Sequence, residues 1–229
     1  MNRPILLPNA RERLWGLCYL TFQVVFLPYL LPWLLRLTGS PLDSLTVNLL
    51  YFAFNLVVAG FVFRQFLMDT IQGVGGNWKT ILLIAAAGFA VYYLMSILVN
   101  ILILTLVPDF SNINDGSISE IGQKSRLLTA MGTVILVPTA EELLHRGAVF
   151  GSFYGKNRLA AYGISTVVFA LVHISGYIGY HPAHILALCF LQYIPAGICL
   201  AASYEFSGNI LTPILIHTAV NTVGILAMR

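Results

Sequence analysis

Residues 141–147 read Glu141-Glu142-Leu143-Leu144-His145-Arg146-Gly147, a cluster of ionisable side chains between the apolar segments 127–137 and 148–153. A charge inside an apolar segment costs free energy, so it persists where it faces a bundle interior or a wet cavity. The stretch therefore predicts a helix that is buried on this face and carries a functional site.

The spacing inside this stretch separates its two carboxylates. Side chains four residues apart lie on the same face of a helix, so Glu142 and Arg146 are expected to form an ion pair. Glu141 is rotated away from that pair and lacks such a cation, which makes it the candidate general base. His145 follows Glu141 by four residues and is placed to hydrogen-bond it. The competing interpretation is a helix that ends at the membrane surface with its charges solvated.

The composition limits the class of protein. The chain has 229 residues, of which 58% are hydrophobic and 9% charged, whereas soluble domains carry roughly 25% charged residues. We therefore expect an all-α, polytopic transmembrane bundle in a lipid bilayer. The net charge of +3 is small and does not indicate a nucleic-acid partner.

The apolar segments predict seven transmembrane spans, with an eighth left open. A span needs about 20 apolar residues, and suitable segments lie at roughly 14–35, 46–62, 80–107, 127–153, 159–178, 185–204 and 210–228. We divide the chain into N-terminal helices with about three spans at 1–108, a polar loop at 109–124, and a core with about four spans and the unusual chemistry at 125–229.

The positive-inside rule predicts the orientation. A cytoplasmic N-terminus puts seven cations inside and four outside; the first group is Arg3, Arg11, Arg13, Arg64, Lys79, Lys156 and Arg158, and the second is Arg36, Lys124, Arg126 and Arg229. We expect an integral, multi-pass protein of a prokaryotic plasma membrane, with its N-terminus in the cytoplasm.

Two further spans carry polar side chains. Glu141 precedes Asn157, in the turn between two spans, by 16 residues, and His173 follows it by 16. An antiparallel hairpin would therefore place Glu141 and His173 at the same depth. His217 and Asn221 are four apart and share a helix face. The alternative interpretation of either histidine, taken alone, is a core residue whose side chain is simply hydrogen-bonded.

These residues resemble the motifs of one family. Glu141-Glu142-x-x-x-Arg146, Phe169-x-x-x-His173 and His217-x-x-x-Asn221 match, in order, the motifs of the CPBP intramembrane proteases, which include CAAX prenyl endopeptidases and bacteriocin-processing or immunity (Abi) proteins. The resemblance covers roughly residues 125–225, and it is the order of three weak motifs on separate spans that makes it specific.

The resemblance implies an all-helical intramembrane endopeptidase. It assigns water activation to Glu141 with His173, and stabilisation of the oxyanion to His217 and Asn221; Glu142, Arg146 and Phe169 are supporting residues. The family is usually labelled as metalloproteases, although a metal-free mechanism has also been argued. One zinc ion on Glu141, His173 and His217 stays an open alternative, because zinc on Glu141 would leave the site without its base.

The expected substrate is a peptide or lipidated peptide, either of the prenylated CAAX type or bacteriocin-like. Two other functions remain open. One is a non-catalytic immunity or scaffold protein that binds a peptide. The other is a small proton-coupled transporter that relays protons through the buried Glu and His residues, against which the lack of an internal repeat counts.

Overall fold

The computed structural model of the protein describes residues 4–39 and 43–228. Over these ranges the chain forms helices and no β-strand, which confirms the all-α prediction. Two of the cations used for the orientation, Arg3 and Arg229, lie outside the described residues.

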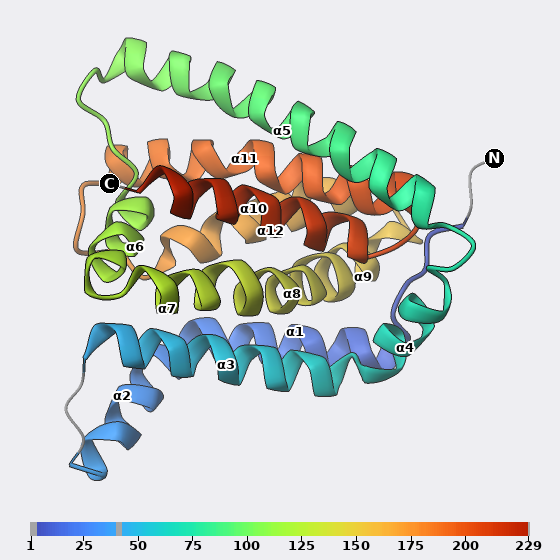
Figure 1. Ribbon diagram of the computed structural model, residues 1–229, viewed down its shortest axis with the longest axis horizontal. Helices are drawn as coiled ribbons and strands as arrows, with labels where there is room; N and C mark the ends of the chain where they lie inside the picture. Colours follow the sequence, from blue (N-terminus) through green and yellow to red (C-terminus); the bar gives the residue numbers. More distant parts are fainter. Residues whose placement is uncertain (1–3, 40–42, 229) are drawn as a thin grey trace.

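A continuous helical rod with two π-helical stretches runs through the middle of the bundle (Figure 1). It consists of α7 (Arg126–Ala130), the π-helical η1 (Met131–Leu136), α8 (Val137–Glu142), the π-helical η2 (Leu143–Phe150) and α9 (Gly151–Tyr154). On one side the rod packs against α1 (Ala10–Val25) and α3 (Ser44–Val62), and on the other against α10 (Arg158–Ser175) and α12 (Leu211–Ala227). The stretch 141–147 therefore lies at the centre of the fold.

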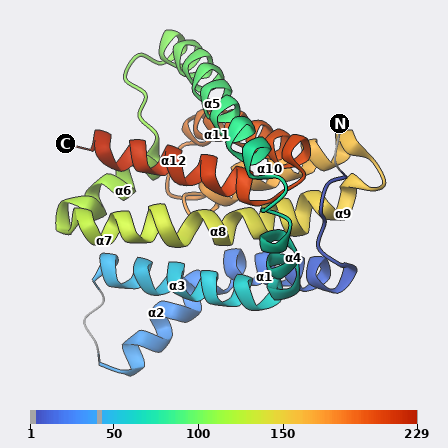
Figure 2. The same ribbon diagram turned by 45° about the vertical axis from the view of Figure 1, so that its right-hand side comes forward.

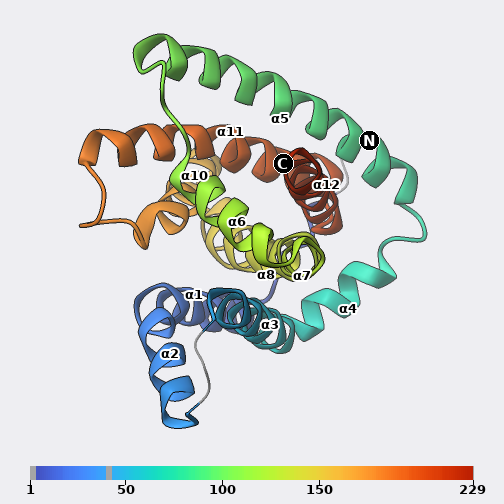
Figure 3. The ribbon, with the colours of Figure 1, turned by 60° about the vertical axis from the view of Figure 1, so that its left-hand side comes forward.

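The remaining helices surround this centre. The long α5 (Trp78–Leu106) lies along the outside of α11 (Ala183–Ser207) and α12, as Figure 2 shows from a second side. Helix α4 (Arg64–Gln72) carries the chain from α3 around to α5 (Figure 3), and α2 (Leu27–Leu37) swings away from the bundle. Helix α6 (Ile113–Lys124) lies at the end of the molecule opposite to α4.

All seven predicted segments are helical, but fewer qualify as spans. Five helical segments are long and apolar enough to cross a membrane by length and composition: Ser44–Val62, Trp78–Leu106, Arg126–Tyr154, Arg158–Ser175 and Ala183–Ser207. The first predicted span is a pair of helices bent by 63°, which makes a sixth span if it crosses as one. The last is an apolar helix of 17 residues. The described residues thus support five or six spans rather than seven or eight.

Proline explains the bend in the first segment. Pro28 stands in the first turn of α2, and its ring removes an N–H and clashes with the carbonyl four residues earlier. Helix α1 ends at Val25, and a new helix starts in another direction. A hydropathy pattern reads the two helices as one continuous span because both are apolar.

The segment predicted as a polar loop contains a helix. Residues 113–124 form α6, which begins where the Asn112 side chain accepts hydrogen bonds from the backbone N–H groups of Asn114 and Asp115. An Asn at this position is a strong helix start, a signal that the loop interpretation passed over. The division of the chain into parts at 108 and 124 stays a prediction.

Helices α10 and α11 approach each other closely at Gly197. A Cβ atom there would lie 2.6 Å from the Thr166 methyl group and 2.9 Å from the Thr166 Cα atom. Because one of these atoms belongs to the backbone, the neighbour cannot rotate away. The absence of a side chain at Gly197 is therefore required for this packing.

We predict that Gly197→Ala lowers the free energy of unfolding by about 1–3 kcal/mol, the usual cost of overpacking a core. Thermal unfolding in detergent measures the change. Gly163→Ala in α10 is the matched control, since nothing lies within 4 Å of a Cβ atom there, and it is expected to be neutral or stabilising by up to about 1 kcal/mol. Equal effects of the two substitutions would contradict the packing argument.

Candidate functional site

The buried charges of the 141–147 stretch form the expected ion pair. The Arg146 Nε atom lies 3.1 Å from Glu142 Oε2, and both side chains are fully buried. The guanidinium also faces the carbonyl groups of Ala196 and Gly197 in α11, at 3.4 and 3.3 Å, and stacks over the Phe169 ring at 4.6 Å. Arg146 thus neutralises Glu142 and links the central rod to α10 and α11.

Glu142 also orients a histidine from the last helix. The His217 Nδ1 atom lies 2.8 Å from Glu142 Oε1. A carboxylate only accepts hydrogen bonds, so Nδ1 carries the proton of this contact. The other ring nitrogen, Nε2, points to Glu141 and lies 3.9 Å from its Oε2 atom.

His173 is oriented by its own helix. Its Nδ1 atom donates to the Phe169 carbonyl oxygen at 2.8 Å, which leaves Nε2 as the acceptor of the neutral ring. The ring lies beside Phe169 and Tyr193, with centroid distances of 4.4 and 4.3 Å. Its Nε2 atom lies 3.7 Å from Glu141 Oε2, so the hairpin of the central rod and α10 brings the two residues together as the sequence spacing predicted.

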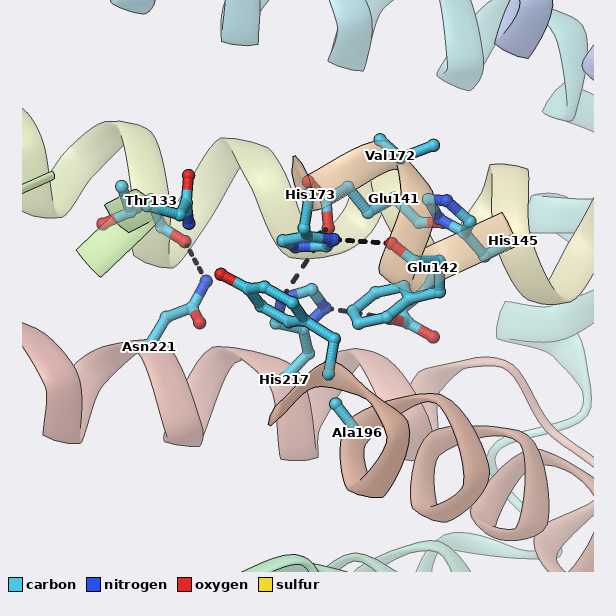
Figure 4. A network of polar contacts seen from close by, with 12 residues as sticks. Thr133, Glu141, Glu142, His145, Val172, His173, Ala196, His217 and Asn221 are labelled. Carbon is cyan, nitrogen blue, oxygen red and sulfur yellow. Dashed lines mark hydrogen bonds and ion pairs between the residues drawn. The ribbon is translucent and has the colours of Figure 1, made fainter. Parts of the chain in front are cut away.

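Glu141 is the point on which these groups converge (Figure 4). Its Oε2 atom is buried and accepts no hydrogen bond from the described residues, while two imidazole Nε2 atoms lie within 4 Å of it. When both imidazole rings are neutral, Glu141 Oε2 and the two Nε2 atoms are all hydrogen-bond acceptors. They face one another with no donor between them. A water molecule bound there can donate to the carboxylate and to an imidazole.

Asn221 is held by an irregularity in the central rod. Its Nδ2 atom donates to the Thr133 carbonyl oxygen at 2.7 Å. In η1 each N–H pairs with the carbonyl five residues earlier, as Val137 does with Gly132. Thr133 would therefore pair with residue 138, but Pro138 has no N–H. The carbonyl that Pro138 leaves free is the one that Asn221 binds.

His145 differs from its predicted contact. Its Nδ1 atom lies 2.8 Å from the backbone oxygen of Glu141 rather than from the carboxylate. The ring is fully buried and packs edge-on against Phe169 at 5.1 Å. It therefore supports the wall behind the site.

A cavity of about 920 Å³ adjoins these groups. Five of the predicted site residues line it, namely Glu141, Phe169, His173, His217 and Asn221, whereas Glu142 and Arg146 lie behind its wall. It is also lined by residues without a motif in the sequence, including Tyr51, Asn114, Asp115, Thr133 and Tyr193. For only one of these residues does the sequence hold a clue. Pro138, five residues after Thr133, has no N–H to bind the Thr133 carbonyl group.

The side chains in this arrangement do not form a ready metal-ligand set. Among the residues that the structure describes, no three His, Cys, Asp or Glu side chains are disposed to hold one ion. The predicted zinc ligands Glu141, His173 and His217 converge, but at 3.7 and 3.9 Å across the carboxylate oxygen. The zinc set remains a prediction.

Comparisons with known proteins agree with the motifs. The sequence model of a family described as Rce1-like, type II CAAX prenyl endopeptidase, matches residues 123–223. A relative, the UPF0177 protein YxdF of Lactococcus lactis subsp. lactis (strain IL1403), is 33% identical over 128 residues, which is 56% of this chain and 66% of that protein. The match thus spans slightly less than two thirds of the relative. No solved structure matches the chain.

A helical bundle with several apolar helices of membrane-spanning length defines an integral membrane protein. Within that class, residues 123–223 are similar to the Rce1-like family of type II CAAX prenyl endopeptidases, which agrees with the resemblance inferred from the three motifs.

The buried ion pair generates a stability prediction. Arg146→Met or Glu142→Leu leaves one charge buried and unpaired, and each is expected to cost about 3–5 kcal/mol of unfolding free energy. The double variant Glu142→Leu with Arg146→Met removes both charges and is expected to cost less than the sum of the two. Thermal unfolding in detergent completes the cycle. Lys124→Ala, which breaks an exposed ion pair with Asp43, is the control and should change little. Additive effects at Glu142 and Arg146 would contradict the coupling.

Proposed function

We propose that this protein is an intramembrane endopeptidase that hydrolyses a peptide bond of a membrane-associated substrate with water activated by Glu141 and His173. One observation carries the proposal. Among the described residues the Glu141 carboxylate has no salt bridge to a lysine or arginine and no hydrogen-bond donor, and it faces two imidazole nitrogens in the wall of a large cavity. The family match supports the same reaction class.

The first step follows from this geometry. A water molecule between Glu141 Oε2 and His173 Nε2 gives a proton to one of them as its oxygen attacks the peptide carbonyl carbon. The carbonyl π bond opens, and its electron pair moves to the oxygen. When the tetrahedral intermediate collapses, the C–N bond breaks and the same group returns the proton to the leaving amine.

The oxyanion of the intermediate needs hydrogen-bond donors. Asn221 uses one amide hydrogen on Thr133 and has a second one free to donate. His217 donates from Nε2 only as an imidazolium, because Glu142 already occupies Nδ1–H.

The test is cleavage of quenched-fluorescent peptides, including prenylated CAAX peptides and bacteriocin-like precursors, by purified protein in liposomes. Glu141→Gln and His173→Ala are expected to lower kcat/KM at least about a hundredfold, the usual contribution of an acid–base group. His181→Ala is the matched control, because His181 is exposed in the loop between α10 and α11 and does not line the cavity.

Each outcome of this assay points to one function. Cleavage that survives Glu141→Gln would refute the mechanism, and peptide binding without cleavage would favour an immunity or scaffold protein. Proton flux in the liposomes without cleavage would favour the transporter. A zinc chelator added to the wild type separates a zinc site from catalysis by the carboxylate alone.

The orientation is part of the proposal. The end of the bundle with α4 and the α9–α10 turn carries six described cations, Arg11, Arg13, Arg64, Lys79, Lys156 and Arg158, while the α6 end carries Arg36, Lys124 and Arg126. We place the N-terminus in the cytoplasm of a prokaryote and the protein in its plasma membrane. The cavity is lined by α6 and the adjoining ends of α3 and α12, so it faces away from the cytoplasm.

Cysteine labelling in intact cells measures this orientation. In a Cys18→Ser background, Glu120→Cys on α6 is expected to react with a membrane-impermeant maleimide, whereas Lys156→Cys at the other end reacts only after permeabilisation. Both positions are exposed, and the remaining Cys189 and Cys199 are buried. The reverse pattern would place the cavity on the cytoplasmic side.

A further inference from the structure

Helix α6 forms part of the cavity wall. Asn114, Asp115, Ile118 and Ser119 of α6 line the same cavity as Glu141 and His173. The helix is anchored by Tyr177, whose hydroxyl lies 3.3 Å from Asn114 Oδ1 and 3.1 Å from Ser117 Oγ. The segment 109–124 therefore covers the site in addition to connecting two helices.

Asp115 is a charged group of this wall that the proposed reaction does not use. It stands in the first turn of α6, where an acidic side chain often serves the helix start. Here Asn112 makes the cap, because its side chain accepts the N–H groups of both Asn114 and Asp115. The Asp115 carboxylate has no hydrogen bond or ion pair within the described chain, so it is free to bind a group in the cavity.

The surroundings of Asp115 lack a compensating cation. Burial raises the pKa of its carboxyl group, and the His173 imidazole opposes that rise. The other titratable groups that interact with it electrostatically are neutral: Tyr92, Tyr193 and Cys189. Among the described residues that line the cavity, none is a lysine or arginine, whereas Asp115 and Glu141 are both acidic. A cation that enters the cavity would be stabilised by both carboxylates.

We propose that Asp115 is a specificity-determining residue, which binds a lysine or arginine side chain of the peptide close to the bond that is cleaved. The inference rests on the proposed function, since it places this subsite in the same cavity as Glu141 and His173. A substrate with a basic residue there pairs with the carboxylate at the cavity wall. An acidic residue at that position is repelled.

The first test compares peptides that differ only by Lys, Leu or Glu, scanned on both sides of the cleaved bond. At one position the wild type is expected to prefer Lys over Glu by about tenfold or more in kcat/KM, as for one charge-assisted hydrogen bond. Asp115→Asn should remove this preference while cleavage of the Leu peptide persists, and Asp115→Lys should reverse it. Glu120→Gln is the control, because it removes the same charge from α6 at an exposed position outside the cavity wall. This variant should retain the preference for Lys over Glu.

A binding measurement separates this subsite from catalysis. In the Glu141→Gln background, fluorescence anisotropy should report tighter binding of the Lys peptide than of the Glu peptide, and adding Asp115→Asn should abolish the difference. If the Lys peptide binds more tightly but the wild type cleaves no peptide, the proposed endopeptidase function is refuted and the Asp115 subsite stands. Cleavage that depends on Glu141 but shows no charge preference would overturn the subsite. Equal binding of the two peptides, or binding of neither, would also overturn it.

Discussion

The buried ion pair between Glu142 and Arg146 is the interaction on which the rest of the site depends. Either charge alone would be too costly at full burial, because desolvation outweighs any remaining contact. As a pair they join four helices: Arg146 reaches the carbonyl groups of α11 and the Phe169 ring of α10, and Glu142 holds His217 of α12. Because Arg146 pairs directly with Glu142, Glu141 has no salt bridge to a lysine or arginine among the described residues.

Both histidines beside Glu141 are oriented by a hydrogen bond at Nδ1, but the two acceptors differ. In both His173 and His217 the Nδ1 atom is bound, so Nε2 is the nitrogen that faces the carboxylate. For His173 the acceptor is the carbonyl of Phe169, one turn earlier in the same helix, so its orientation is local. For His217 the acceptor comes from a residue 75 positions away, so its orientation exists only in the folded bundle.

Irregular backbone geometry serves the site as well. Pro138 and the π-helical turns on either side of α8 interrupt the regular hydrogen-bond ladder of the central rod. Inside a membrane a free carbonyl group must find another partner. The Asn221 amide fills this need at Thr133, and the contact fixes α12 beside the cavity. The loss of one backbone bond thus positions a side chain proposed to contact the reaction's oxyanion.

The sequence by itself determined the all-helical class, the long apolar segments that become helices and the residues that gather around Glu141. These follow from local rules: apolar runs, the four-residue helix spacing of Glu142 with Arg146, and the equal distances of Glu141 and His173 from the turn at Asn157. Only the tertiary structure decided that α1 and α2 diverge at Pro28, that His217 binds Glu142, and that α6 brings Asp115 into the cavity. Such contacts join residues far apart in the chain, and no local periodicity encodes which helix faces lie against each other.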